Sequence, residues 1–340
     1  MTSERTALII GATGGIGSEV AAALLRRSWR VRALTRRSAD AAERASGRLG
    51  IEWITGDAMT AADVTAAAQG SHLIFHGANP PRYENWRGLA LPMLESSIAA
   101  AQASGARIVF PGTVYNFGPD AFPLLSERSP QRPLTRKGQI RVDMERRLEA
   151  AASAGVRTLI VRAGDYFGPR AGNSWFSQGL ISSGRPVRSV AYPGPHAVGH
   201  SWAYLPDVAA TIAQLLERDL AAFEVLHFQG HWFERGVQIA DAVRRVVGNP
   251  RLPIRSFPWW AIYAASPFVA MFREMIEMRY LWREPLRLDN TKLNAFLGTE
   301  PHTPIDEAIA ITLHGLGCLE DRDGAQIAPH RPMESRPGLK

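Results

Sequence analysis

The sequence predicts an α/β fold: a doubly wound parallel sheet of about seven strands with a smaller C-terminal cap. Short apolar or β-branched runs alternate with longer alanine-rich helical patterns through the first two thirds of the chain, and a glycine-rich turn joins the first strand to the first helix. Strand, helix and strand in this order require right-handed crossovers. The strands are therefore expected to be parallel, with helices on both faces of the sheet.

The strands and helices can be placed one by one along this alternation. The strands are expected at residues 6–10, 31–35, 51–55, 72–78, 107–113, 157–164 and 224–230. The helices between them are expected at 15–28, 59–70, 88–105 and 140–155, and several of these close with glycine, as helix C-termini often do. Beyond residue 170 the pattern loosens, and helices are expected near 206–218, 236–248 and 304–316.

Composition restricts the classes of partner. The chain has 340 residues, 46% of them apolar, and a net charge of +7; all but three of its 39 basic residues are arginines. The arginines are dispersed, so anionic small molecules are expected as ligands and nucleic acid is not. The single cysteine, Cys318, excludes a disulfide framework, and no metal is expected because no helical histidine pair is present. Without a signal-peptide pattern or a bilayer-spanning run, a cytoplasmic protein is expected.

The turn after the first strand has the spacing G-x-x-G-x-x-G. The first glycine allows a tight turn, the second lets backbone amides approach a pyrophosphate, and the third allows close packing of helix on strand. Its position between a strand and a helix is the context that the dinucleotide-binding (Rossmann) fingerprint requires. We therefore expect this loop to bind the cofactor through Gly11, Thr13, Gly14, Gly15, Ile16 and Gly17.

The end of the second strand indicates which dinucleotide binds. NAD-binding proteins usually place a carboxylate here, whereas this chain has Thr35, Arg36 and Arg37. A guanidinium group is well suited to a 2′-phosphate, so NADP is the expected cofactor. A solvated basic loop is the alternative, because arginine is abundant throughout the chain.

With these features the sequence resembles the short-chain dehydrogenase/reductase superfamily, in its extended NAD-dependent epimerase/dehydratase branch, over roughly residues 5–320. The motifs that carry the resemblance are "GATGGIG", "GDA", "HGANPP", "FPGTVYNFGP", "VRAGDYFGP" and "HSWAYLPDVA". The resemblance implies that Asp57 and Ala58 border the adenine and that Gly77 and Ala78 border the central portion of the cofactor. It also implies that "TVY" marks the active-site end of the fifth strand.

The superfamily's catalytic pair, Y-x-x-x-K, is absent. Matched through Glu145, the tyrosine's place falls on Lys137 and the lysine's on Arg141. The hydroxyl expected on the fifth strand is also displaced: Pro111 stands in its place, and Thr113 and Tyr115 are the nearest hydroxyls.

The replacement has a chemical logic, because residues 137 and 141 are one helical turn apart and point to the same face. Nearby positive charge favours loss of the Lys137 proton, which makes it a candidate general acid, and Arg141 can donate hydrogen bonds to a ribose or a substrate anion. A solvated Lys137 is the alternative, with Tyr115 as the acid. Tyr166, Asn116 and His200 are weaker candidates.

Two functions remain open at this point. One is an NAD(P)-dependent oxidoreductase or epimerase acting on a carbonyl or carbinol carbon of a small molecule, and the other is a non-catalytic NADP-binding sensor or scaffold. The substrate is open between a sugar nucleotide and a more apolar ligand, and a homodimer is compatible with the sequence.

The chain is expected to divide into three parts: an NADP-binding Rossmann core at 1–170, late core elements interleaved with a substrate cap at 171–325, and a disordered tail at 326–340. The apolar segment 258–272 is too short to span a bilayer and contains Pro267. A buried or cap helix is expected there, with an interfacial membrane contact or a lid over a ligand as alternatives.

Overall fold

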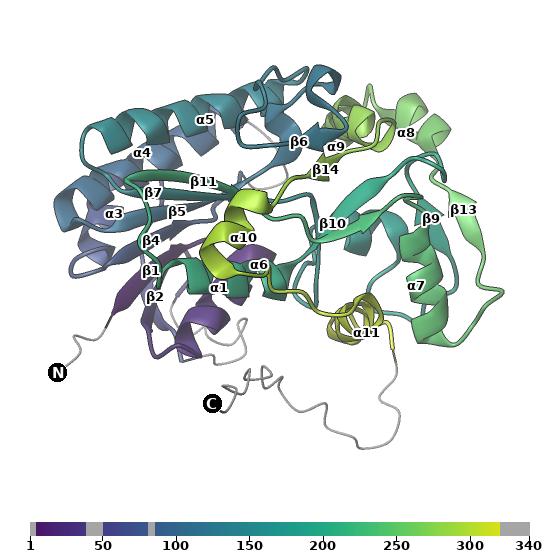
Figure 1. Cartoon of the computed structure of the whole chain (residues 1–340), viewed down its shortest axis with the longest axis horizontal. Helices are drawn as coiled ribbons and strands as arrows, with labels where there is room; N and C mark the ends of the chain where they lie inside the picture. The colour runs from purple at the N-terminus through teal and green to yellow at the C-terminus, as the bar shows by residue number, and fades with distance from the viewer. Residues whose placement is uncertain (1–4, 39–49, 81–85, 320–340) are drawn as a thin grey trace, which may run out of the picture.

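The computed structural model describes residues 5–38, 50–80 and 86–319, and it is built around a seven-stranded sheet (Figure 1). All neighbouring strands of this sheet pair in parallel. In spatial order the strands are β11 (Phe223–His227), β7 (Thr158–Arg162), β5 (Arg107–Gly112), β4 (Leu73–His76), β1 (Thr6–Ile10), β2 (Arg30–Thr35) and β3 (Glu52–Thr55). The predicted doubly wound parallel sheet is confirmed, and each of its strands lies within a few residues of its expected place.

Helices cover both faces of the sheet, because its strands carry apolar side chains on both faces. On β1, Leu8 and Ile10 belong to one buried cluster, while Ala7 and Ile9 belong to another on the opposite face. The first cluster is covered by α3 (Ala61–Ala67), α4 (Trp86–Ser104) and α5 (Arg136–Ser153), and the second by α1 (Gly15–Leu25), α6 (Leu205–Leu215) and α10 (Thr291–Leu297) (Figure 1).

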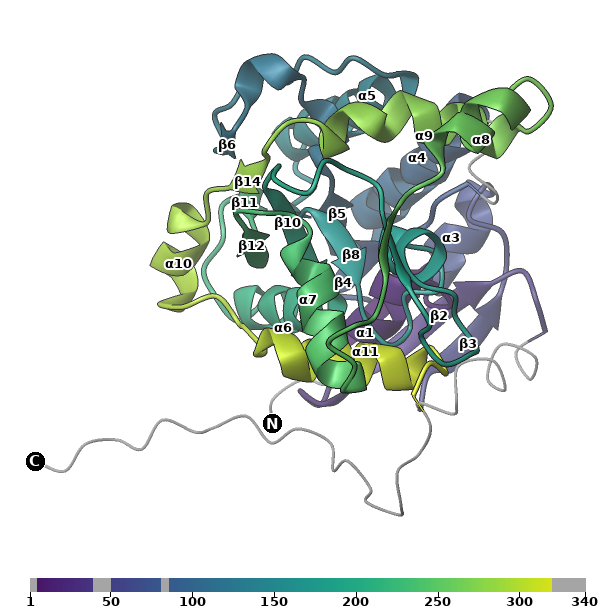
Figure 2. The same cartoon turned by 90° about the vertical axis from the view of Figure 1, so that its right-hand side faces the viewer.

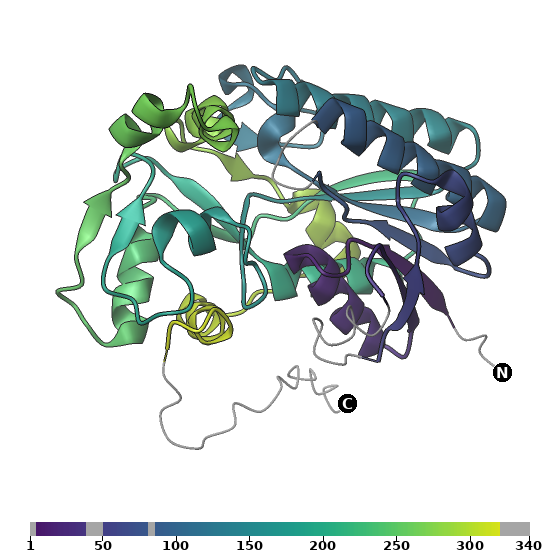
Figure 3. The same cartoon turned by 180° about the vertical axis from the view of Figure 1, so that it is seen from behind.

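The smaller part of the chain lies beyond the carboxyl ends of the central strands, where β7 continues into the cap strand β8 (Figures 2 and 3). Its strands form one sheet of three and two of two: β8 (Asp165–Phe167), β10 (His200–Tyr204) and β12 (His231–Phe233); β9 (Val190–Tyr192) and β13 (Ile254–Ser256); β6 (Leu124–Leu125) and β14 (Arg287–Leu288). Its helices include α7 (Gln238–Val247) and α11 (Ile305–Gly315), close to their predicted places, and the π-helical turn Trp175–Leu180. A third buried cluster, with Phe167, Trp202 and Trp282 near its centre, holds this part together.

The segment predicted as one helix over 258–272 is two short helices, α8 (Trp259–Ala265) and α9 (Ala270–Glu277). Pro267 lies in the connection, where the lack of an amide hydrogen and the restricted φ of proline oppose a continuous helix. The prediction of a cap element is correct, but a buried helix is wrong for its outer side, since Trp260 and Phe268 are 78% and 89% exposed.

The described part of the chain contains no helix that is long and apolar enough to cross a membrane. Among the same residues, no group of histidine, cysteine, aspartate or glutamate side chains is arranged to hold a metal ion. The tail predicted at 326–340 lies outside the described residues.

Candidate active site

The glycine loop between β1 and α1 is shaped by positions that have no room for a side chain. Gly11 has a φ of +92°, and a Cβ atom there would lie 2.7 Å from the carbonyl oxygen of Gly77. At Gly17 a Cβ atom would lie 2.2 Å from the carbonyl oxygen of Gly11. The loop therefore packs against the end of β4 at one side and against the first turn of α1 at the other, as the predicted roles of these glycines require.

The same loop leaves an anion-binding surface open. Thr13 and Gly14 are exposed, Gly15 and Ile16 are half-buried, and α1 begins at Gly15. The first backbone amides of a helix have no carbonyl partner within the helix, and they lie at the positive end of its dipole. These residues fit the pyrophosphate of a dinucleotide.

Substituting alanine for Gly17 is expected to lower the affinity for the cofactor by about 10-fold or more, because the new Cβ must displace the Gly11 carbonyl and open the loop. Titration of cofactor into the purified variant measures the effect. Gly172→Ala is the matched control, since a Cβ atom there meets nothing within 4 Å. Equal loss in both variants would contradict this reading of the loop.

The residues predicted to contact the adenosine ribose of the cofactor follow β2. After β2, Thr35 is buried and its hydroxyl accepts from the backbone amide of Arg37 at 3.1 Å, while the side chains of Arg36 and Arg37 are both exposed. The two arginines are therefore accessible to an anionic ligand.

The predicted adenine-side residues Asp57 and Ala58 lie in the turn between β3 and α3. The Asp57 carboxylate accepts from the amide of Met59 at 2.9 Å, and Ala58 packs against the cluster under α3. On the other side of the loop, the amide of Gly77 donates to the carbonyl of Ile10 at 2.8 Å and so joins the ends of β4 and β1.

Helix α5 presents the predicted Lys137 and Arg141 to the interior. Thr135 begins the helix by accepting from the amide of Gly138 at 3.0 Å. Lys137 and Arg141 are each only 5% exposed. The alternative of a solvated Lys137 is therefore wrong, and the two side chains share a buried face as their spacing predicts.

The surroundings of these two cations differ from those expected. The Lys137 ammonium forms an ion pair with Glu274 of α9, with Nζ 2.9 Å from Oε2. Arg141 donates from Nη2 to Asn79 Oδ1 at 2.8 Å, and its guanidinium carbon lies 5.3 Å from the ring centroids of both Trp86 and Phe110. The expectation that Lys137 experiences mainly like charge is wrong, because a carboxylate from the cap faces it.

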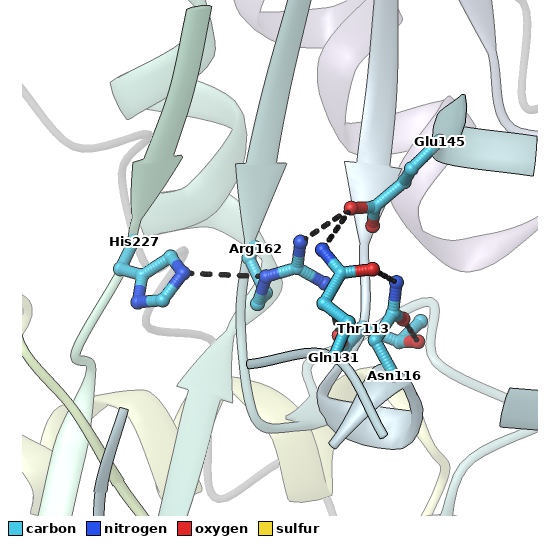
Figure 4. A network of polar contacts seen from close by, with 6 residues as sticks. All are labelled: Thr113, Asn116, Gln131, Glu145, Arg162 and His227. Carbon is cyan, nitrogen blue, oxygen red and sulfur yellow. Dashed lines mark hydrogen bonds and ion pairs between the residues drawn. The ribbon is translucent and has the colours of Figure 1, made fainter. Parts of the chain in front are cut away.

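The threonine after β5 ends a chain of oriented hydrogen bonds (Figure 4). The Glu145 carboxylate can only accept, so the amide nitrogen of Gln131 donates to it at 2.9 Å, and the Gln131 oxygen is left to accept from Asn116 at 3.0 Å. The Asn116 oxygen then accepts from the Thr113 hydroxyl at 3.4 Å. The polarity of every member of this chain, including Thr113, therefore follows from the charge on Glu145.

Arg162, at the end of β7, holds this chain in place (Figure 4). It is 1% exposed, donates from Nη2 to Glu145 at 2.7 Å, and donates from Nη1 to the backbone oxygen of Thr113. Its Nε donates to Nε2 of His227 at 3.3 Å, so His227 must carry its proton on Nδ1, where it donates to the carbonyl of Leu125. In the sequence, Glu145 served only to match the helix to the family's catalytic helix, and Arg162 was not predicted as a site residue.

Two buried histidines are held neutral near the site. Burial, with Arg162 nearby, lowers the pKa of His227 to about 3. Burial, with Arg141 nearby, likewise lowers the pKa of His76 to about 3. The Nδ1 atom of His76 lies 2.7 Å from the hydroxyl of Ser97, which itself donates to the carbonyl of Met93.

These shifts predict a contribution to acid sensitivity. The pKa of His227 is lower in the folded state than its ordinary value of 6.5, so the unfolded chain binds the proton first as the pH falls. The stability that depends on neutral His227 is therefore present above pH 6.5 and is lost as the pH falls towards about 3. Between pH 7 and pH 5, the free energy of unfolding measured in urea should decrease less in His227→Gln than in the parent. An equal decrease in the free energy of unfolding of both proteins would contradict this prediction.

The weaker candidates have different surroundings. Tyr115 is half-buried in the 3₁₀ turn Val114–Asn116. The Tyr166 hydroxyl is buried and has no hydrogen-bond partner among the described residues; burial, opposed by Arg141 and Arg162, raises the pKa of Tyr166 to about 12. His200 is paired with Asp165 at 2.8 Å and stacked on Trp282.

A small cavity lies between the end of β5 and the cap, lined by Val114, Gly164, Asp165, His200, Ser201, Leu281 and Leu286. Its lining combines an ionisable pair with apolar side chains. The cavity thus lies where residues that follow β5 and β7 meet the cap, and substrates of open α/β sheets bind outside the carboxyl ends of the strands.

Comparison with known proteins agrees with this geometry. The family model described as "NAD dependent epimerase/dehydratase family" matches residues 7–226. No curated protein matches the sequence.

Several solved structures share the fold. The UDP-glucuronic acid 4-epimerase from Bacillus cereus, in complex with UDP-glucuronic acid and NAD, has 15% identity and a TM-score of 0.71, covering 92% of this chain and 98% of that one. The UDP-glucose 4-epimerase from Bifidobacterium longum, with NAD⁺ and UDP, has 15% identity and a TM-score of 0.69, covering 91% and 97%. A putative epimerase from Burkholderia cenocepacia J2315 has 18% identity and a TM-score of 0.71, covering 93% and 99%.

The family model covers most of the central sheet, including the glycine loop, the helix bearing Lys137 and the strand that ends at Arg162. The chain therefore belongs to the NAD dependent epimerase/dehydratase family, a family of enzymes, as its motifs predict.

Proposed function

We propose that the protein is an NADP-dependent enzyme that moves a hydride to or from a carbonyl or carbinol carbon of a small molecule, with Lys137 in place of the family's tyrosine. The observation that carries this proposal is the burial of Lys137 and Arg141 beside the loop that follows β4. Arg141 contacts Asn79 of that loop, and Gly77, two residues earlier, packs against the glycine loop. These contacts support the proposal that the altered pair lies beside the cofactor.

The glycine loop fits a dinucleotide, whose nicotinamide supplies the hydride when bound. In reduction, the Lys137 ammonium gives a proton from Nζ to the carbonyl oxygen as its carbon becomes a carbinol, and the resulting amine regains a proton from water. In the reverse direction the amine receives the hydroxyl proton. Arg141 donates hydrogen bonds to a ribose hydroxyl or an anionic substrate group but does not transfer protons.

Thr113 orients the substrate oxygen. Its proton is directed to Asn116, so it presents a lone pair that receives the hydroxyl of an alcohol. Donation to a carbonyl instead requires only that the 3.4 Å bond to Asn116 be released. The same side chain can therefore serve either direction of the reaction.

The substrate class is proposed from the structural neighbours. Solved structures of the same fold contain UDP or UDP-glucuronic acid. Nucleotide sugars are therefore the first substrates to test, followed by ketones, aldehydes and enones, which also offer a carbonyl group to the proposed hydride transfer. A change in NADPH absorbance with any of these, or conversion of a nucleotide sugar to its epimer, would support the enzyme, and neither change with the whole panel would contradict it.

A family member that binds NADP without turnover is the alternative. The observation in its favour is the ion pair between Lys137 and Glu274, since the ammonium is already engaged by a carboxylate of the cap. Saturable NADP binding with neither an absorbance change nor conversion of any substrate in the panel would select this function.

Arg36 is expected to set the preference for NADP. A 2′-phosphate gains charge-assisted hydrogen bonds from its exposed guanidinium group, worth about 1.5–3 kcal/mol when partly desolvated, which corresponds to a preference of about 10-fold to 100-fold over NAD. Titration with both cofactors should show this preference in the parent and its loss in Arg36→Ala. Arg146→Ala, which removes another exposed arginine, is the matched control. Equal affinities in the parent would mean that Arg36 and Arg37 form only a solvated loop.

A further inference from the structure

An exposed apolar surface lies on the two cap helices α8 and α9. Among the described residues, seven large apolar side chains are largely exposed, and four of them fall between residues 260 and 271. They are Trp260, Tyr263, Phe268 and Met271, with Phe268 the most exposed at 89%. A concentration of this kind, rather than scattered single residues, marks an interaction surface.

The charges of the two helices are segregated. Both carboxylates of α9 are directed towards α5: Glu274 pairs with Lys137, and Glu277 accepts from the backbone amide of Arg136 at 2.6 Å. The inner side of α9 thus carries its negative charge.

Two arginines lie beside the exposed apolar side chains, Arg273 on α9 and Arg279 in the 3₁₀ turn Met278–Trp282 that follows it. Arg273 donates to the carbonyl of Ser266, at 2.9 Å, in the segment that joins the helices. Arg279 lies 4.8 Å over the ring of Trp259 and donates to the hydroxyl of Tyr263 at 3.1 Å. We call Trp260, Tyr263, Phe268, Met271, Arg273 and Arg279 the α8–α9 surface.

This surface is also at the edge of the molecule. The two helices lie on the outside of the cap, and in Figure 2 the segment that joins them extends beyond its neighbours. The joining segment, which contains the 89% exposed Phe268, is thus open to a partner on the outside of the cap.

We propose that the α8–α9 surface binds the surface of an anionic lipid bilayer, with Trp260 and Phe268 inserted among the headgroups and Arg273 and Arg279 against lipid phosphates. Indole and phenyl rings beside arginines are the composition that favours the membrane interface, and anionic lipid complements both the local cations and the net charge of +7. A second copy of the chain fits less well, since a symmetric interface through this surface would enclose four arginines, two from each copy.

Sedimentation with lipid vesicles tests the proposal on the full chain. The parent is expected to bind vesicles of phosphatidylcholine mixed with phosphatidylglycerol more tightly than vesicles of phosphatidylcholine alone, and added salt should weaken the difference. The double variant Trp260→Ser/Phe268→Ser should bind the mixed vesicles at least about 10-fold more weakly, because its apolar contact is lost. Arg273→Gln should reduce the preference for the anionic lipid.

Leu124→Ser is the matched control, because Leu124 is also exposed, at 52%, but lies on β6 and not on either of the two helices. It should bind as the parent does, and circular dichroism should show all variants folded. No binding of the parent, or equal binding by the double variant, overturns the proposal. A parent that is dimeric in light scattering, becomes monomeric in the double variant and does not bind vesicles would assign the surface to a second copy instead. None of these measurements depends on catalysis.

Discussion

Replacing Lys137 with methionine is expected to lower turnover by about 100-fold to 10,000-fold, the usual contribution of a general acid or base, while leaving NADP affinity nearly unchanged. Methionine keeps most of the side chain's volume against Trp86 but has no proton to transfer. The glycine loop and Arg36, which are proposed to hold the cofactor, are not altered. The measurement is kcat with the best substrate of the panel, alongside a cofactor titration.

Two further variants identify the acid if turnover changes. Lys137→Arg retains a cation opposite Glu274 but cannot give up its proton, so it should be as inactive as Lys137→Met. Tyr166→Phe removes the buried hydroxyl of Tyr166, another candidate acid, and should retain activity. Activity retained in Lys137→Met and lost in Tyr166→Phe would transfer the proposed role to Tyr166.

Replacing Arg162 with methionine is expected to lower the free energy of unfolding by about 3–5 kcal/mol, as when one partner of a buried ion pair is removed. Glu145, 5% exposed, would lose its cation, and the backbone of Thr113 would lose a donor. Urea unfolding measures the change. Arg146→Met, on the exposed side of α5, is the control and should stay within about 0.5 kcal/mol of the parent.

The double variant Arg162→Met/Glu145→Gln separates loss of charge from loss of packing. If the cost comes from an uncompensated carboxylate, the second substitution should restore part of the lost stability. If the second substitution instead lowers the free energy of unfolding further, as an independent substitution would, then loss of the ion pair is not the source of the lost stability.

The sequence predicted what depends on local pattern. Strand positions, the glycine loop and the shared face of Lys137 and Arg141 follow from periodicities of two and 3.6 residues and from the spacing of glycines. The position of the active-site hydroxyl was harder to predict. Pro111 lies within β5, paired with Val161, and the hydroxyl of Thr113 comes just after the strand has ended.

What the sequence could not predict depends on contacts between distant segments. Glu277 and Arg136 are 141 residues apart, and no local signal directs Glu277 or Glu274 to the start of α5. Arg162 gave a partial signal, since an arginine at the end of an otherwise apolar strand must find a partner when buried. Nothing in its neighbourhood identifies Glu145 as that partner.

The contact between α9 and α5 has a thermodynamic consequence. Glu274 and Glu277 are one turn apart on the same face of α9, and they hold Lys137 and the first amide of α5. The attachment of α9 therefore depends on the positive charge of Lys137, because loss of that charge would remove one of the two contacts that hold α9 to the start of α5. If Lys137 transfers a proton as proposed, the reaction and the position of the cap would be coupled through this ion pair.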